Sequence, residues 1–296
     1  MTAGTIPRAI VGTEVGPVTT DIDARWLMAY AAALGERDHR YFDTGYAEGP
    51  LAHPLFPVCY EWPLALAVRA GMDPVLAPRG VHATHRLRIH RLPRAGDRLT
   101  TRARVLAVEP RRAGALLTIR FATIDAGGAP VTTTDHGSLY RGITCDGERV
   151  GVETAPDEGR APAAGAPSTS DDEAPWTEPI DVPGGAAHVY SECARIWNPI
   201  HTDIAVARAA GLPGLILHGT ATLGLAVSRI VARDVGNDPA GVREVTARFT
   251  GMVCMPARLV VRGRRRADGV TTFDVVDAAG VTVVGQGLLG RRQEPS

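Results

Sequence analysis

Cysteine is scarce in this chain, and its few copies are far apart. The four residues are Cys59, Cys145, Cys193 and Cys254, and no two of them form a C-x-x-C pair. Thiolate metal sites and disulfide frameworks both depend on paired spacings. We therefore expect neither a structural zinc or iron–sulfur site nor a disulfide framework, which is typical of a protein in the reducing cytoplasm.

Net charge and long apolar runs are also absent. Lys plus Arg and Asp plus Glu both number 32, so the formal net charge is zero and gives no reason to expect nucleic acid or an anionic membrane as a partner. No apolar run reaches the roughly 18 residues of a membrane span. Residues 1–12 lack the basic and apolar regions of a signal peptide. The sequence predicts a cytoplasmic globular protein.

One long stretch in the middle of the chain lacks any core-forming pattern. Residues 146–179 are rich in Ala, Pro, Gly and Ser and contain an acidic run. Such a composition buries little apolar surface and favours a linker. The linker divides the 296 residues into an expected N-terminal domain, 1–145, and an expected C-terminal domain, 180–296.

The two expected domains read as copies of each other. Each begins with an amphipathic helix, expected at 21–34 in the first half and 189–196 in the second, and each continues through a loop into a more apolar helix. That second helix contains Leu-Ala-Leu-Ala-Val at 64–68 and Leu-Gly-Leu-Ala-Val at 223–227. The matched order and the matched segments indicate a duplication.

Both halves then turn to strands. Expected strands at 81–90 and 98–105 correspond to strands at 245–253 and 258–264. Each half closes with a hairpin, whose turn is Asp-Ala-Gly-Gly from Asp125 in one half and Asp-Ala-Ala-Gly from Asp277 in the other. The predicted fold class is α+β, with a curved antiparallel sheet wrapped around one long helix in each half.

One segment of the second half carries groups suited to chemistry. Pro199 disfavours α geometry at Asn198 and is expected to end the first helix, which leaves His201 on a loop. Asp203 can cap a short helix over 204–210. His218-Gly219 then opens the long apolar helix.

The start of that long helix suits the binding of a carbonyl oxygen. The first amides of a helix have no internal partners and carry the positive end of the helix dipole. Gly219 lets an oxygen approach its N–H closely, as in an oxyanion hole. An imidazole one loop away, that of His201, could move a proton at a neighbouring carbon.

The segment resembles the signature of the MaoC-like family of (R)-specific enoyl-CoA hydratases and 3-hydroxyacyl-thioester dehydratases. That signature reads roughly G-D-x-N-P-[IL]-H-x-D, followed by A, G, P and H-G. The matching residues are Asn198, Pro199, Ile200, His201, Asp203, Ala209, Gly211, His218 and Gly219.

The resemblance implies two fused hotdog domains, of which the first is an altered copy that shapes the acyl-chain site. It implies reversible hydration of a 2-enoyl thioester carried on CoA or acyl-carrier protein, without a metal or other cofactor. His201 would be the acid/base, Asn198 would position water or the reacting oxygen, and the Gly219 amide would hold the carbonyl. The expected substrate-binding residues are His218, Ile196, Trp197 and Asp203.

The sequence departs from the family pattern at one position. The family's catalytic aspartate is replaced by Ile196, which cannot move a proton and would make the pocket drier. Three hypotheses stay open. His201 still catalyses hydration, alone or helped by Glu192, Asp203 or a first-half group; the reaction has changed, for example to isomerisation or intramolecular addition; or the site binds an acyl thioester without turnover. A hotdog thioesterase is a further rival.

The first half offers a partial mirror of this segment. Residues 35–43 align with 195–203, so that Glu36 falls at the position of the lost acid and Tyr41 at that of His201. Tyr60 or its neighbour aligns with Gly219 and would obstruct the amide. His53 could border the pocket.

Other candidate sites are weaker. Of three histidines in one strand region, His82 and His90 share a face while His85 points the other way, which predicts against a three-histidine metal site. Arg262, Arg264 and Arg266 share a strand face and favour a solvated surface over a phosphate site. A fused hotdog pair already satisfies one interface of the kind by which hotdogs dimerise, and a further homodimer stays open.

Overall fold

The computed structural model describes residues 4–47, 49–76, 79–148, 150–151 and 173–292. Its helices are α1 (Ala24–Ala33), α2 (Pro57–Ala70), α3 (Ala186–Ala194), α4 (Ile204–Ala209) and α5 (Gly219–Asp234), with 3₁₀ turns η1 (Arg8–Ile10), η2 (His39–Tyr41), η4 (Pro199–His201) and η5 (Pro239–Gly241). The first-half strands are β1 (Thr5–Ile6), β2 (Glu14–Asp21), β3 (Gly80–Ile89), β4 (Arg98–Arg111), β5 (Gly114–Ile124), β6 (Pro130–Arg141), β7 (Thr144–Cys145) and β8 (Val150–Gly151). The second-half strands are β9 (Trp176–Val182), β10 (Val242–Phe249), β11 (Ala257–Arg265), β12 (Thr271–Asp277) and β13 (Thr282–Arg291).

A single large antiparallel sheet joins the two halves. Its main order is β2-β4-β5-β6-β3-β10-β13-β12-β11-β9, with β8 added beside β4. Along this order each half contributes five strands in the same relative order, and the halves meet at β3 and β10. The junction is itself antiparallel, with Val245 opposite Leu87. The repeated topology confirms two fused hotdog domains, each a curved sheet around a helix, as the sequence predicts.

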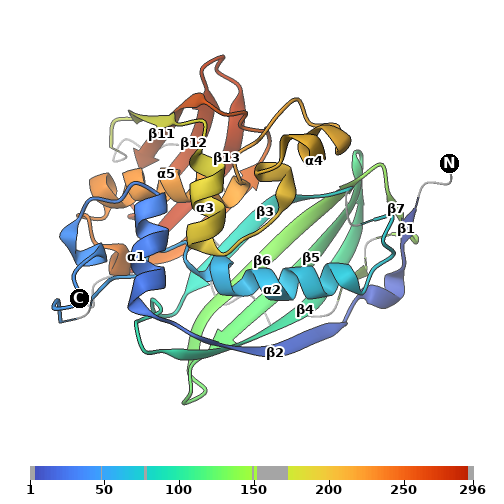
Figure 1. Cartoon of the computed structure of the whole chain (residues 1–296), viewed down its shortest axis with the longest axis horizontal. Coiled ribbons are helices and arrows are strands. Elements are labelled where there is room, and N and C mark those ends of the chain that lie inside the picture. Colours follow the sequence, from blue (N-terminus) through green and yellow to red (C-terminus); the bar gives the residue numbers. More distant parts are fainter. Residues whose placement is uncertain (1–3, 48, 77–78, 149, 152–172, 293–296) are drawn as a thin grey trace.

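One long helix covers the sheet in each half (Figure 1). Helix α2 lies across the first-half strands, and α5 packs on the second-half strands β10 to β13. Both helices are apolar where they face the sheet, and this burial supplies most of the driving force for a curved sheet that has only one covering layer. Helices α1 and α3 lie side by side over the junction, where the Tyr30 and Tyr190 hydroxyls are 3.4 Å apart.

The two hairpin turns repeat down to their hydrogen bonds. In the first, Oδ1 of Asp125 accepts from the N–H groups two and four residues later. In the second, Oδ1 of Asp277 accepts from the same relative positions. Asp at the first position of a turn stabilises it by this side-chain contact, so the predicted turns and their equivalence are confirmed.

The end of α3 differs from the prediction. The helix ends at Ala194, well before Pro199, because Arg195 adopts a left-handed conformation with φ of 57°. Its guanidinium lies 4.0 Å from the centre of the Trp26 ring and 3.4 Å from an Asp23 carboxylate oxygen. These contacts with α1 accompany a backbone conformation that is costly for a residue with a side chain. Pro199 instead opens the 3₁₀ turn η4.

Most of the predicted linker, 146–179, lies outside the described residues, which omit 152–172. The two described ends of that range contain β8, which pairs with β4, and the first residues of β9. We retain the division into 1–145, 146–179 and 180–296 as a proposal. Within the described residues, the helices all fall short of the combination of length and apolarity that crossing a bilayer requires.

Candidate functional site

The loop that carries Asn198 and His201 is held by its own backbone. Asn198 is extended, with φ of −131°, as a residue before proline must be. Its carbonyl accepts from the His201 N–H at 3.1 Å, which closes the turn η4. Asp203 then caps α4 by accepting from the N–H groups of Ala205 and Val206, as predicted. The loop therefore presents His201 in a defined position.

The His201 ring has a defined tautomer. Its Nδ1 lies 2.9 Å from the Ile216 carbonyl oxygen, which can only accept, so Nδ1 carries the proton and Nε2 carries the lone pair. The ring stacks on His218 with centroids 3.7 Å apart. Burial lowers the pKa of His201, and the Ile216 carbonyl partly opposes that effect. His201 is thus a neutral base at pH 7.

His218 is more deeply buried than His201. Its Nε2 lies 3.3 Å from the Ser191 hydroxyl. Burial is the main cause of a pKa well below the usual value for histidine, and the neighbouring His201 lowers it further. Protonation of one of the two stacked imidazoles disfavours protonation of the other, because two positive charges would then lie side by side. The pair can therefore hold only one positive charge at a time.

Gly219 is the first residue of α5, so its N–H belongs to the free amides of the helix start, as predicted. A Cβ added there would lie 3.0 Å from the Phe249 ring. The absence of a side chain at Gly219 therefore leaves room for the Phe249 ring that packs against the helix.

A cavity of about 600 Å³ unites these groups. From the second half, Ile196, Asn198, His201, His218 and Gly219 contribute to its wall. The first half contributes side chains from α2, β3, β5 and β6, so neither half alone encloses the cavity. The structure thus brings together the residues on which the sequence analysis placed the chemistry.

Two residues predicted to bind substrate lie elsewhere. Trp197 is 59% exposed and donates from its indole N–H to the Glu192 carboxylate. Asp203 is exposed and occupied in capping α4. Neither residue, nor Glu192, contributes to the cavity wall. The position of the family aspartate is filled by Ile196, which is buried and borders the cavity, so the wall is apolar there.

The first-half equivalents face another way. Tyr41 and His53 are fully buried outside the cavity wall, which corrects the expectation that His53 borders it. His53 Nε2 lies 3.2 Å from the Ser228 hydroxyl on α5 and 3.7 Å from a Glu36 carboxylate oxygen. Helix α2 begins at Pro57, three residues before Tyr60, and proline has no N–H to donate. The first position of α2 therefore lacks the N–H that Gly219 carries at the first position of α5.

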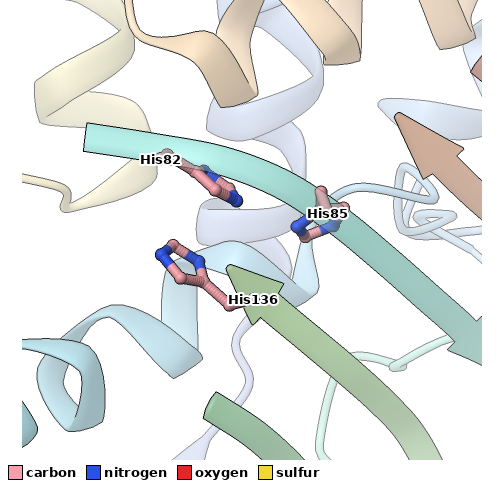
Figure 2. A group of neighbouring side chains, drawn as sticks. All are labelled: His82, His85 and His136. Atoms are coloured by element: carbon pink, nitrogen blue, oxygen red, sulfur yellow. The ribbon is translucent and has the colours of Figure 1, made fainter. Parts of the chain in front are cut away.

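A second polar group in the cavity wall was missed from the sequence. His82 and His85 both line the cavity, although alternation along a strand would place them on opposite faces. A β-bulge causes the difference, because the pairing of β3 with β6 slips by one residue between His82 and Thr84. His136, opposite His85 on β6, completes the group (Figure 2).

Glu61 on α2 is a buried carboxyl group that the sequence analysis also passed over. It lines the cavity and accepts a 2.6 Å hydrogen bond from the Thr134 hydroxyl. Burial raises its pKa to about 8, against the smaller opposing effect of Thr134. Glu61 is therefore a protonated, neutral group at pH 7. An isolated apolar-helix glutamate gives no sequence signal for this role.

The comparisons with known proteins agree in both halves. Residues 187–284 match the MaoC like domain family, and residues 9–134 match the family described as FAS1-like, dehydratase domain region. The chain is 41% identical over 81 residues to fatty acid synthase subunit beta of Aspergillus oryzae, an alignment that covers 27% of this chain and 4% of that subunit. It is 23% identical over 256 residues to the probable enoyl-CoA hydratase 2 of Dictyostelium discoideum, covering 82% and 81% of the two chains.

Among solved structures, the MaoC-like dehydratase from Phytophthora capsici superposes with a TM-score of 0.82 at 23% identity, over 97% of both chains. The fold and the site define a double-hotdog protein in which residues of both halves line one cavity. The chain carries a MaoC-like dehydratase domain in its second half and a FAS1-like dehydratase region in its first. It spans only a small part of the fatty acid synthase subunits that it matches, 4% of one and 5% of another.

Proposed function

We propose that the protein catalyses the reversible addition of water to a 2-enoyl thioester to form a 3-hydroxyacyl thioester. The observation that carries this proposal is the meeting of the His201 Nε2 lone pair and the free amide of Gly219 on one cavity. The first places a base and the second an oxyanion donor beside a carbonyl and its β-carbon. The kinship with enoyl-CoA hydratase 2 supports the same reaction.

The proposed step conserves atoms and charge. His201 Nε2 takes a proton from water as the water oxygen bonds to the β-carbon, and the electron pair of the double bond moves to the thioester oxygen. The Gly219 amide stabilises the resulting enolate. The imidazolium then delivers its proton to the α-carbon, so one group serves as base and as acid. Asn198, in the same wall, would orient the water or the reacting oxygen.

Ile196 sets the limit on this chemistry. Without a carboxylate beside His201, the imidazolium formed in the first step has no fixed counter-charge, and burial already disfavours it. We expect a slower reaction than a site with both groups would support, because one positioned acid/base is worth about 10²- to 10⁴-fold. Binding without turnover, isomerisation and intramolecular addition are the alternatives. A site without the carboxylate favours them because they depend less on the activation of a water molecule by a pair of acid/base groups.

The finer assignments follow from the same site. The first half is proposed as the copy that shapes the acyl-chain end, because its strands and α2 form the opposite wall. The carrier is proposed to be CoA or acyl-carrier protein, since either presents the same thioester. All four cysteines are free, which supports the cytoplasm as the proposed compartment. We expect no nucleic acid partner, and a homodimer stays a hypothesis.

The test is a hydration assay on 2-enoyl-CoA substrates of short, medium and long chain. Loss of the conjugated thioester absorbance is followed with the wild type and with His201→Ala. We expect turnover of at least one substrate and a fall in kcat/KM of about 10²- to 10⁴-fold in the variant.

A matched control comes from the first half. Tyr41→Phe removes only a hydroxyl at the position equivalent to His201, and kcat/KM should stay within about 3-fold of wild type, since Tyr41 lies outside the cavity wall. Tight binding of the substrates without turnover would instead establish the binding role, and undiminished turnover in His201→Ala would remove His201 from the mechanism.

A further inference from the structure

Three imidazole rings from two neighbouring strands converge on the cavity. His85 and His136 are direct partners across β3 and β6, and the bulge in β3 brings His82 onto the same face (Figure 2). One ring nitrogen from each histidine lies within 4.8 Å of the others. His136 is far from the other two in the sequence, and simple alternation would place His82 and His85 on opposite strand faces. The pairing of β3 with β6 and the bulge in β3 therefore bring the three together.

His85 is the member whose ring makes no hydrogen bond within the part of the chain that the structure describes. His85 is only 2% exposed, and neither of its ring nitrogens has a hydrogen-bond partner among the described residues. Buried polar atoms are nearly always satisfied, and an orphaned imidazole in a cavity wall indicates a ligand that the protein itself does not supply. The His85 imidazole, which lines the cavity, is therefore free to bind a ligand there through a ring nitrogen.

The other two rings are already oriented by backbone and hydroxyl groups. Nε2 of His82 lies 3.1 Å from the Thr84 carbonyl oxygen, which fixes the proton on Nε2 and leaves the lone pair on Nδ1. Nε2 of His136 lies 3.0 Å from the Ser138 hydroxyl. Histidines that bind metals are typically oriented in this way, with one nitrogen bonded to a carbonyl or hydroxyl and the other free for the metal.

The charge state of the group also suits a cation. Burial holds the pKa of His85 at about 4 and that of His136 at about 3, and it is the main cause of the low pKa of His82. All three rings are therefore neutral at pH 7, which is the form that binds metals. Glu61, in the same cavity, is held by Thr134, so the available donors are nitrogens.

We propose that His82, His85 and His136 bind one divalent transition-metal ion of the zinc class. Three imidazoles form a known type of zinc site that leaves a fourth position open, here toward the cavity. All-nitrogen donors favour zinc, cobalt, nickel or copper over magnesium or calcium, which require oxygen ligands. The ion would share the cavity with the proposed thioester site, while the inference itself is independent of the hydration activity.

The geometry sets a structural requirement. Two nitrogens bound to a tetrahedral zinc lie about 3.4 Å apart, given bonds of about 2.0–2.1 Å. The nitrogens here lie within 4.8 Å, so the widest pair must move closer. His82 and His136 are stacked, with ring centroids 3.8 Å apart and planes 18° apart. Binding therefore requires these rings to turn from face-to-face stacking to edge-on coordination, by rotation about their side-chain bonds.

The experiment is direct metal binding by the chelator-treated full-length chain. Zinc is titrated by calorimetry, and cobalt binding is followed by its visible absorption, which reports the ligand geometry. We expect one equivalent of zinc, a tetrahedral cobalt spectrum, and a rise in melting temperature of about 5 °C with zinc and none with magnesium. His85→Ala and His136→Ala should each weaken zinc binding by about 10²-fold or more.

His90→Ala is the matched control, because His90 follows the same strand and contacts Thr133 away from the group. Its zinc affinity should equal that of the wild type. The proposal is overturned if the wild type binds no stoichiometric zinc, a result that needs no variant to fold. It is overturned equally if His85→Ala, shown to be folded by its melting curve, keeps full affinity. Absence of metal together with altered acyl-chain preference in His85→Ala would assign the group to substrate recognition instead.

Discussion

Two loops of this protein have the same backbone conformation, but their side chains face different surroundings. Gly35 and Arg195 are both left-handed, with φ of 71° and 57°. The N–H of the next residue, Glu36 in one loop and Ile196 in the other, bonds to the carbonyl five positions back at 3.1 and 3.0 Å. Each loop then forms a 3₁₀ turn that ends in Tyr41 or His201.

The side chains are distributed in the opposite sense to the family expectation. The half without the cavity site holds the carboxyl group, Glu36, while the half with His201 holds Ile196 at the same position. Glu36 is turned toward His53 and Ser228, and burial raises its pKa. A helix from the other half thus closes the first loop. The same backbone therefore supports a structural polar contact in one copy and a cavity site in the other.

The comparison teaches that the neighbour of a loop decides its role. In the first loop Glu36 is directed at His53 and at Ser228 of α5, although its Oε1 makes no hydrogen bond among the described residues. His201 Nε2, in contrast, is left with its lone pair on a cavity. Duplication gave the chain two loops of equivalent backbone conformation, and fusion of the two halves allowed α5 to pack on the first of them. Three changes to the chain can break or sharpen this comparison.

The largest expected effect concerns Glu61, the carboxyl group that the first half places in the cavity. Its folded pKa of about 8 exceeds the ordinary 4.5, so the folded state keeps a proton that the unfolded state releases between pH 4.5 and 8. Stability is therefore lost as pH rises through this window. Glu61→Gln should be more stable than wild type at pH 8, on the order of 4 kcal/mol, and nearly equal to it at pH 4.5.

Denaturant unfolding at the two pH values measures this difference. The same variant also tests whether Glu61 replaces the lost aspartate in catalysis. We expect its hydration rate to stay within about 3-fold of wild type, since His201 alone is assigned the proton transfer. A fall of about 10²-fold would make Glu61 the second acid/base and change the proposed mechanism.

Restoring the acid should make the second loop more like the first, which holds Glu36 at the same position. Ile196→Asp places a carboxylate in the cavity wall that also contains His201 and His218, where it can stabilise an imidazolium. Hydration should rise by about 10-fold to 10²-fold, while stability falls by about 2 kcal/mol because a buried apolar side chain becomes a polar one. Enoyl-CoA kinetics and thermal melting are the measurements.

Glu36→Gln is the control for that change, at the same loop position in the other half. It should leave the hydration rate unaltered, because Glu36 is outside the cavity wall. If Ile196→Asp reduced turnover, the cavity would be adapted to a reaction that needs a dry wall, and isomerisation or intramolecular addition would gain over hydration.

The smallest effect belongs to Asp203, which was predicted to bind substrate and is found capping α4. Asp203→Ala should cost about 1 kcal/mol of stability through the lost cap. Its kcat/KM should stay within about 2-fold of wild type, as expected for a residue outside the cavity wall. Asp203→Asn, which preserves a capping oxygen, should recover most of the stability. A large fall in kcat/KM in both variants would return Asp203 to the substrate site.

Local patterns were enough to predict much of this molecule. Turns at Asp125 and Asp277, the cap at Asp203 and the helix start at Gly219 each depend on neighbours within a few residues, so short-range hydrogen bonding dictates them. Repetition of these patterns predicted the duplication, and the spacing from Asn198 to Gly219 predicted the candidate site. What the turns and the cap share is that their side-chain to backbone hydrogen bonds join residues at most four positions apart.

Only the tertiary structure decided the rest. Arg195, which ends α3, contacts Trp26 of the other half, and His53, which packs on the first loop, contacts Ser228, 175 residues later. The histidine group depends on a bulge in β3, which reverses the face that alternation assigns to His85. Each is a contact between segments remote in the chain, where packing and strand register, rather than local preference, determine which side chain faces the cavity.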